Sequence, residues 1–282
     1  TTIKSTVPIL PTPTAHTNPL VVISDIANSI YPVEIRPTQG DTKNTFIGAN
    51  AGKVATTAFN NTVLGSTAGA AITSGSNNTF IGYVSGNLIS TATYNTFVGT
   101  ATGRLTTGSF NTFLGGNSAY LNTTGASNLF VGYNSGSSNT TGSSNTFIGT
   151  SSGSNNIADD YNTAVGRSSL VSNTIGTANS GFGYKALFSN TTGGSNTAIG
   201  YQSLQFNTYG YNNNAIGNQS LKFNTIGSNN SSIGNKALLK NTTGSNNNAI
   251  GNQSLQNNII GNNIINKKRN QFFRKMIWTV II

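Results

Sequence analysis

Apolar and polar positions alternate along this chain in a pattern that repeats every 17 residues. Each repeat contains an Asn, a short run of strand-forming residues and a Gly, as in Asn-Thr-Ala-Ile-Gly at 196–200. Aligned on that glycine, thirteen copies run from Gly48 to Gly251, and only the interval between Gly99 and Gly115 is shorter, at 16 residues. A strict period indicates one supersecondary unit stacked on copies of itself. The sequence therefore predicts an all-β fold, a parallel β-solenoid (β-roll) of about 13 coils.

Positions within a copy are numbered here from the glycine as zero, and position −4 is Asn in all thirteen copies. An amide that recurs once per coil is able to bond to the same amide above and below it, and to the backbone of a turn. We interpret this column as a structural ladder and not as a reactive site. Its representative members are Asn44, Asn61, Asn78, Asn196, Asn213 and Asn247.

Position −1 is apolar in every copy. This pattern predicts a buried column, because burying an unpaired polar group costs about 1–3 kcal/mol. Neighbouring residues of a strand point to opposite faces, so position −2 lies on the other side of the sheet. Only one of the two faces can be the interior of a thin coil, and the pattern leaves open which one.

Positions −2 and +4 change together along the chain. In copies one to seven, −2 is Phe except for Val63 and +4 is Gly except for Ala119, whereas from copy eight −2 is small and +4 is Leu. The paired change predicts that both side chains share one packing volume. If −1 faces inward, this second column lies outside, where it forms a patch too large to leave in water. The candidates for an assembly face are therefore Phe46, Phe80, Phe97, Phe113, Phe130, Phe147, Leu170, Leu187, Leu204, Leu221, Leu238 and Leu255.

The second half of the repeat reads Asn-Thr-Thr-Gly or a variant of it at +7 to +10, and +10 is Gly in nine copies. Glycine admits the backbone angles of tight turns. We therefore expect two short strands per coil, each followed by a turn that contains Gly.

Two segments flank the repeats, which occupy residues 44–261. Residues 1–43 hold all six prolines, and Pro8 to Pro19 predicts an extended arm. The β-prone runs 20–23 and 30–35 follow, and they either cap the first coil or donate a strand to another subunit. Residues 262–282 form a basic and apolar tail, interpreted as a cap or an attachment segment, and any membrane contact is confined to residues 267–282.

Composition narrows the classes of function. The chain has no Cys and a single histidine, His16, without acidic neighbours, so we expect no catalytic, cofactor or metal site and no enzyme. The net charge of +10 arises mainly because acids are scarce, and five of the fifteen basic residues lie in the last sixteen positions. Scattered basic residues do not indicate a nucleic-acid partner.

The phrase at 196–208, with its echoes at 213–224 and 247–258, resembles the head repeats of YadA-type trimeric autotransporter adhesins. Similar repeats occur in phage and large-virus fibre proteins. The resemblance implies a left-handed, trimeric β-roll on a cell or virion surface, used for structure or attachment. The coil here is longer than the usual head repeat, so a fibre subunit fits better than an intact autotransporter.

The leading hypothesis is a structural subunit of an extracellular or virion-surface fibre, whose partner is itself, as a homotrimer or an end-to-end filament. A second hypothesis is an adhesin that binds a host glycan or surface protein through variable positions. A third is an ice-binding protein that uses the Thr residues at −3. The candidate contact residues of the adhesin are Tyr83, Tyr133, Tyr184, Tyr201, Phe206 and Phe223.

Overall fold

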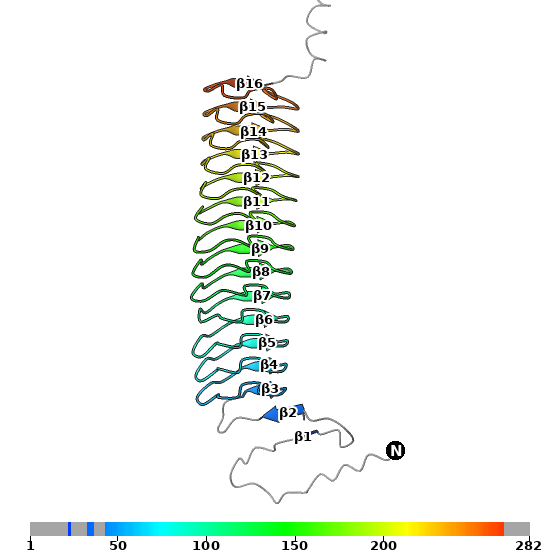
Figure 1. Cartoon of the computed structure of the whole chain (residues 1–282), viewed down its shortest axis with the longest axis vertical. Coiled ribbons are helices and arrows are strands. Elements are labelled where there is room, and N and C mark those ends of the chain that lie inside the picture. The colour runs from blue at the N-terminus through cyan, green and yellow to red at the C-terminus, as the bar shows by residue number, and fades with distance from the viewer. Residues whose placement is uncertain (1–21, 24–32, 37–42, 268–282) are drawn as a thin grey trace, which may run out of the picture.

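The computed structural model describes residues 22–23, 33–36 and 43–267, whose strands form one sheet in which strand order follows chain order (Figure 1). The strands are β1 Val22–Ile23, β2 Val33–Arg36, β3 Thr45–Ile47, β4 Thr62–Leu64, β5 Thr79–Ile81, β6 Thr96–Val98, β7 Thr112–Leu114, β8 Leu129–Val131, β9 Thr146–Ile148, β10 Thr163–Val165, β11 Ser180–Phe182, β12 Thr197–Ile199, β13 Asn214–Ile216, β14 Ser231–Ile233, β15 Asn248–Ile250 and β16 Ile265–Lys267. All pairs from β3 to β16 are parallel, which confirms the predicted β-solenoid with its 17-residue period.

The short copy keeps the register of the sheet. Thr96 of β6 pairs with Thr112 of β7 although only 16 residues separate them. The missing residue falls in the turn between β6 and β7. There the N–H groups of Thr107 and Gly108 both donate to the carbonyl of Thr123. Because the turn absorbs the deletion, the strands above and below remain aligned.

Each coil contains one strand, so the prediction of two was wrong. In the second half of the coil, two or three N–H groups donate to one carbonyl of the next coil. The amides of Thr191, Thr192 and Gly193, for example, all donate to the Thr208 oxygen, at 3.1–3.2 Å. Three donors converge on one acceptor only where the chain turns, whereas an extended strand would spread them along its partner.

The first coil is capped by antiparallel strands. Strand β2 pairs with β3, with Ile35 opposite Ile47, and β1 pairs with β2. Strand β1 falls within the β-prone run 20–23, and β2 overlaps the run 30–35 and extends one residue past it, to Arg36. The extended arm at Pro8 to Pro19 and His16 lie outside the described residues.

At the other end, the stack continues past the predicted boundary at residue 261. Strand β16 pairs with β15 in the repeat register, with Ile265 opposite Asn248. The solenoid therefore reaches Lys267, and the rest of the tail, residues 268–282, lies outside the described residues.

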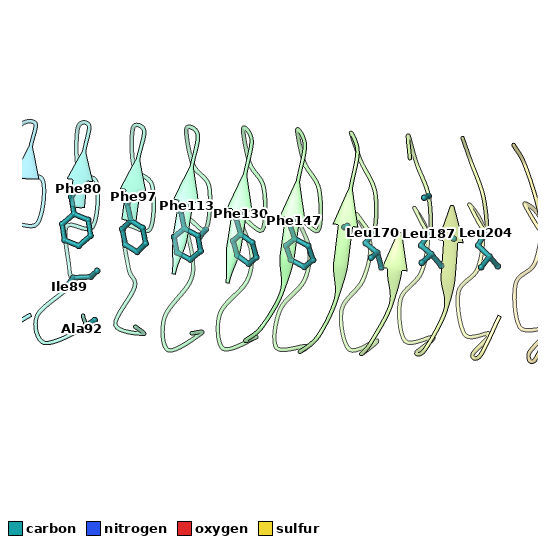
Figure 2. Close-up of a cluster of buried hydrophobic side chains, with 14 of the residues drawn as sticks. Phe80, Ile89, Ala92, Phe97, Phe113, Phe130, Phe147, Leu170, Leu187 and Leu204 are labelled. Carbon is teal, nitrogen blue, oxygen red and sulfur yellow. The ribbon is translucent and has the colours of Figure 1, made fainter. Parts of the chain in front are cut away.

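The core consists of the residues that the sequence analysis assigned to an assembly face, and that assignment was wrong. Phe46 and the Phe and Leu side chains after it, as far as Leu238, are at most 1% exposed within a single chain, and Leu255 is partly buried against them. Figure 2 shows the Phe rings in one column that the Leu side chains continue. The rings from Phe80 to Phe147 stack at 4.7–5.1 Å between centroids. These side chains fill the coil and are not available to a partner.

Positions −2 and +4 share one volume, as the paired change predicts. A Cβ added to Gly153 would lie 2.5 Å from ring atoms of Phe147. In copy eight, −2 is Ala164, and Leu170 at +4 occupies the space. Leu170 keeps a φ of 52°, close to the 56° of Gly153. The left-handed backbone costs a leucine about 1–2 kcal/mol, so its packing must offset that cost.

Candidate functional site

The asparagines at position −4 lie in a hydrogen-bonded column along one corner of the coil. The backbone N–H of Asn213 donates to Oδ1 of Asn196 at 3.0 Å, and its Nδ2 donates to the Gly227 carbonyl at 2.8 Å. The Oδ1 of Asn213 in turn accepts the N–H of Asn230. The same pattern links Asn44, Asn61 and Asn78 at one end and Asn247 at the other. Each side chain thus ties a coil to its neighbour and closes a turn.

A second asparagine ladder, at position +7, was missed by the sequence analysis. Nδ2 of Asn207 donates to Oδ1 of Asn190 and to the Gly210 carbonyl, both at 2.8 Å. The column runs from Asn122 to Asn258, and in earlier copies Ile72 and Ile89 occupy the same interior position. The signal was present in the sequence, because position +7 is Asn in every copy from the fifth onward.

The column at −1 lies on the outer surface of the sheet, so the prediction that it is buried was wrong for the single chain. Its side chains are all partly or fully exposed, as at Leu64 (44%) and Ile199 (40%). Residue −3 shares this outer face, because it is two positions away in the strand. We call the column the sheet-face file, and its members are Ile47, Leu64, Ile81, Val98, Leu114, Val131, Ile148, Val165, Phe182, Ile199, Ile216, Ile233 and Ile250.

The aromatic residues proposed for adhesin contacts lie on the surface but are not all together. Tyr83 and Tyr133 are 59% and 56% exposed and stand in separate coils. The other four gather in copies nine to eleven, where two pairs stack across coils. Tyr184 lies 5.4 Å from Tyr201, and Phe206 lies 5.5 Å from Phe223, measured between ring centroids.

Amide and lysine side chains connect the two aromatic pairs. Lys222 Nζ donates to Oε1 of Gln202 at 2.9 Å and lies 5.9 Å and 5.3 Å from the ring centroids of Phe206 and Phe223. On the tyrosine side, Lys185 lies over Tyr184 at 5.4 Å. We call the surface formed by Tyr184, Tyr201, Gln202, Phe206, Lys222 and Phe223 the aromatic–amide strip.

An open groove of about 690 Å³ adjoins this strip. Its lining includes Phe206, Phe223 and Lys240 at position +6 and Thr208, Thr225 and Thr242 at position +8. The threonine hydroxyls donate to carbonyls of the next coil, as from Thr208 to Thr225 at 3.0 Å. Their methyl groups and the rings make the lining mostly apolar. Because the groove crosses successive coils, it runs along the axis of the stack.

The acidic pair at residues 159 and 160 interrupts a column of glycines. Asp159 occupies position +10, is 5% exposed and accepts a hydrogen bond from Nδ2 of Asn173 at 3.1 Å. Burial, and then the charge of Asp160, raise the pKa of Asp159 to about 7. Asp160 itself accepts the backbone N–H of Ser143. The pair is therefore built into the turn hydrogen bonds.

Within the described residues, no group of three or more His, Cys, Asp or Glu is placed to hold a metal ion. The same part of the chain contains no helix long and apolar enough to cross a membrane. No protein-family model matches the chain, and neither curated proteins nor solved structures gave a match.

Proposed function

We propose that this chain is a structural subunit of an extracellular or virion-surface fibre, in which solenoids associate side by side through the sheet-face file. The observation that carries the proposal is the file itself, which is apolar in all thirteen copies and partly exposed in each. Scattered exposed apolar residues need no explanation, but a continuous apolar stripe marks an interaction surface. The resemblance of the repeat to adhesin heads and fibre proteins supports the same function and location.

The free energy gained by burying the sheet-face file determines how much of its length a partner must cover for stable association. Complete burial of an Ile, Val or Leu side chain is worth about 1.5–3 kcal/mol, so covering a side chain that is about 40% exposed yields roughly 0.6–1.2 kcal/mol. Five members of the file are 37–44% exposed and the other eight are less exposed, so the whole file yields at most about 8–16 kcal/mol, against an association cost of about 4–15 kcal/mol. Stable association therefore requires solenoids aligned along most of their length.

The capped first coil favours lateral association over continuation of the stack at that end. Strand β2 already occupies the free edge of β3, in the antiparallel sense. A second solenoid therefore finds no open parallel edge there, because antiparallel pairing differs from the repeat register. A closed trimer, with three sheet faces around a common axis, satisfies both observations.

Light scattering coupled to size exclusion tests this proposal. At micromolar concentration the wild-type chain is expected to form an oligomer, and a double variant, Ile199→Lys with Ile233→Lys, is expected to be monomeric. Both side chains belong to the file and are 40% and 38% exposed, so the folded monomer should tolerate the change. The control is Ile226→Lys, because Ile226 is 52% exposed but lies outside the file.

A strictly monomeric wild type would overturn the proposal, as would an oligomer that survives the double substitution while circular dichroism shows an intact fold. Thermal hysteresis measured on the same samples tests the ice-binding hypothesis, since the partly exposed Thr residues at −3 share the sheet face.

A further inference from the structure

We infer that the aromatic–amide strip and the groove beside it form a binding site for an extended anionic polysaccharide that lies along the solenoid axis. The site uses a different surface from the sheet-face file, so it goes beyond the proposed assembly and does not depend on it. Its residues come from copies nine to thirteen, and none of them belongs to the sheet-face file.

The strip is one continuous surface, because contacts connect its parts. Lys185 Nζ lies 5.4 Å from the ring centroid of Tyr184 and 5.1 Å from that of Phe188. It therefore links the tyrosine column to Phe188, which occupies position +5. Lys222, which also occupies position +5, contacts Gln202 and the rings of Phe206 and Phe223. A ligand that reaches the tyrosines can therefore contact amides, an ammonium group and the phenylalanines without leaving the surface.

An unsatisfied acceptor lies next to the strip, on the residue before Phe206. Gln205 is 6% exposed, and its Oε1 has no hydrogen-bond partner. Gln205 precedes Phe206 in copy ten and occupies position +5, the position that Lys222 holds in the next coil. A buried acceptor without a donor is unfavourable. A rotation of this side chain toward the surface breaks no hydrogen bond at Oε1 and allows it to accept from a ligand hydroxyl.

The chemistry of the site favours a sugar chain with negative charges. Exposed ring surface, as on Tyr201 (46%) and Phe223 (41%), attracts the positively polarised C–H groups of a sugar ring. Amides and threonine oxygens suit hydroxyl groups. Lys222 and Lys240 suit carboxylate or sulfate groups, and no acidic residue follows Asp160 in the sequence to repel them.

The groove determines the orientation of the ligand. It continues from the phenylalanines to Lys240 and Thr242 across successive coils, and it is open along its length. A linear polymer fits this shape better than a compact ligand. Nucleic acid fits the charge less well, because tight binding of a phosphate backbone uses about 6–10 basic contacts and the strip and groove supply few.

The test uses the full chain with four probes: hyaluronan oligosaccharides, dextran sulfate, neutral dextran and oligo-dT. Calorimetry is expected to show binding to at least one charged saccharide and much weaker binding to neutral dextran. The double variant Tyr201→Ala with Phe223→Ala should weaken that binding by about tenfold or more, as expected for exposed aromatic anchors. Lys222→Met should weaken it and reduce its salt dependence. The matched control is Tyr133→Ala, because Tyr133 occupies the position of Tyr201 in another coil.

Tighter binding of oligo-dT than of every saccharide would overturn the inference in favour of nucleic acid. Loss of binding in Lys222→Met with no effect of the aromatic changes would show charge attraction alone, and would also overturn it. Absence of binding to all four probes would also overturn the inference. Light scattering of each variant separates these outcomes from the assembly proposal, because none of the changes touches the sheet-face file.

Discussion

The shared volume of positions −2 and +4 predicts that the boundary between the Phe and Leu halves of the core can be moved by one coil. The perturbation is Phe147→Ala together with Gly153→Leu, which gives copy seven the core of copy eight. Phe147 is fully buried and its ring stacks at 4.8 Å on Phe130. Copy seven is the right place, because its neighbour already carries Ala164 and Leu170.

The magnitudes follow from the geometry. Phe147→Ala alone leaves a cavity and should cost about 3–5 kcal/mol. Gly153→Leu alone forces a side chain against a ring 2.5 Å from its Cβ, in a left-handed backbone, and should cost about 2–5 kcal/mol. In the double variant the leucine fills the cavity, so only the backbone cost and the lost ring stacking remain, about 2–3 kcal/mol. The double variant is therefore expected to be about 5 kcal/mol more stable than the sum of the two single changes predicts, and at least about 2 kcal/mol more stable at the ends of these ranges.

The assay is urea unfolding followed by far-ultraviolet circular dichroism. Because stacked repeats unfold in segments, the data require a nearest-neighbour model and not a two-state fit. The control combines Gly153→Leu with Phe80→Ala, whose ring lies in a different coil, and these two changes should be additive. If Phe147→Ala and Gly153→Leu are also additive within about 0.5 kcal/mol, the shared-volume reasoning is refuted.

Two further predictions concern the polar interior. Asn213→Ala should lower the free energy of unfolding by about 2–4 kcal/mol, because it removes the bond to the Gly227 carbonyl and leaves the buried Asn230 N–H without its acceptor, whereas Asn252→Ala on the surface should change it by less than about 0.5 kcal/mol. Asp159, whose pKa is about 7 when folded and 3.8 in the reference state, binds more protons in the folded chain. The wild type should therefore lose about 3 kcal/mol of stability as pH rises from about 4 to about 7, and Asp159→Asn should abolish this loss.

Both predictions are checked by chemical unfolding, the second over a series of pH values. Equal effects of Asn213→Ala and Asn252→Ala would contradict the ladder as a source of stability. Stability that is independent of pH in the wild type, or that rises over this range, would contradict the burial of a neutral Asp159.

Much of the fold was predictable from the sequence, because comparing thirteen copies position by position shows which residue types each position requires. The period predicted the parallel stack, and the invariant Asn at −4 predicted a ladder. The simultaneous change at Phe147/Gly153 and Ala164/Leu170 predicted one packing volume. The second ladder at +7 was equally regular from Asn122 onward, but Ile72 and Ile89 interrupt it in the early copies, so its interior position was not recognised.

The candidate surfaces were less predictable, because they depend on contacts between coils. The adhesin hypothesis named six aromatic residues from their variable positions, yet only the structure separates isolated Tyr83 and Tyr133 from the four that gather in neighbouring coils. Lys222 reaches Gln202, twenty residues earlier, only because the two lie one coil apart. Neither a local motif nor the period itself encodes such a contact.

The sequence by itself determined the period, the parallel stacking and the exchange of volume between −2 and +4. Only the tertiary structure decided which face is inside. Alternation in a strand places −1 and −2 on opposite faces, and both positions are apolar in the first seven copies. The pattern alone therefore does not tell which of the two faces is inside the coil. The chain bends at glycine zero, and this bend brings position +4 back over position −2. Side chains at these two positions therefore face each other in the interior of the coil. That closure buries Phe147 and Leu170, and it leaves the −1 file outside, where it becomes the proposed assembly face.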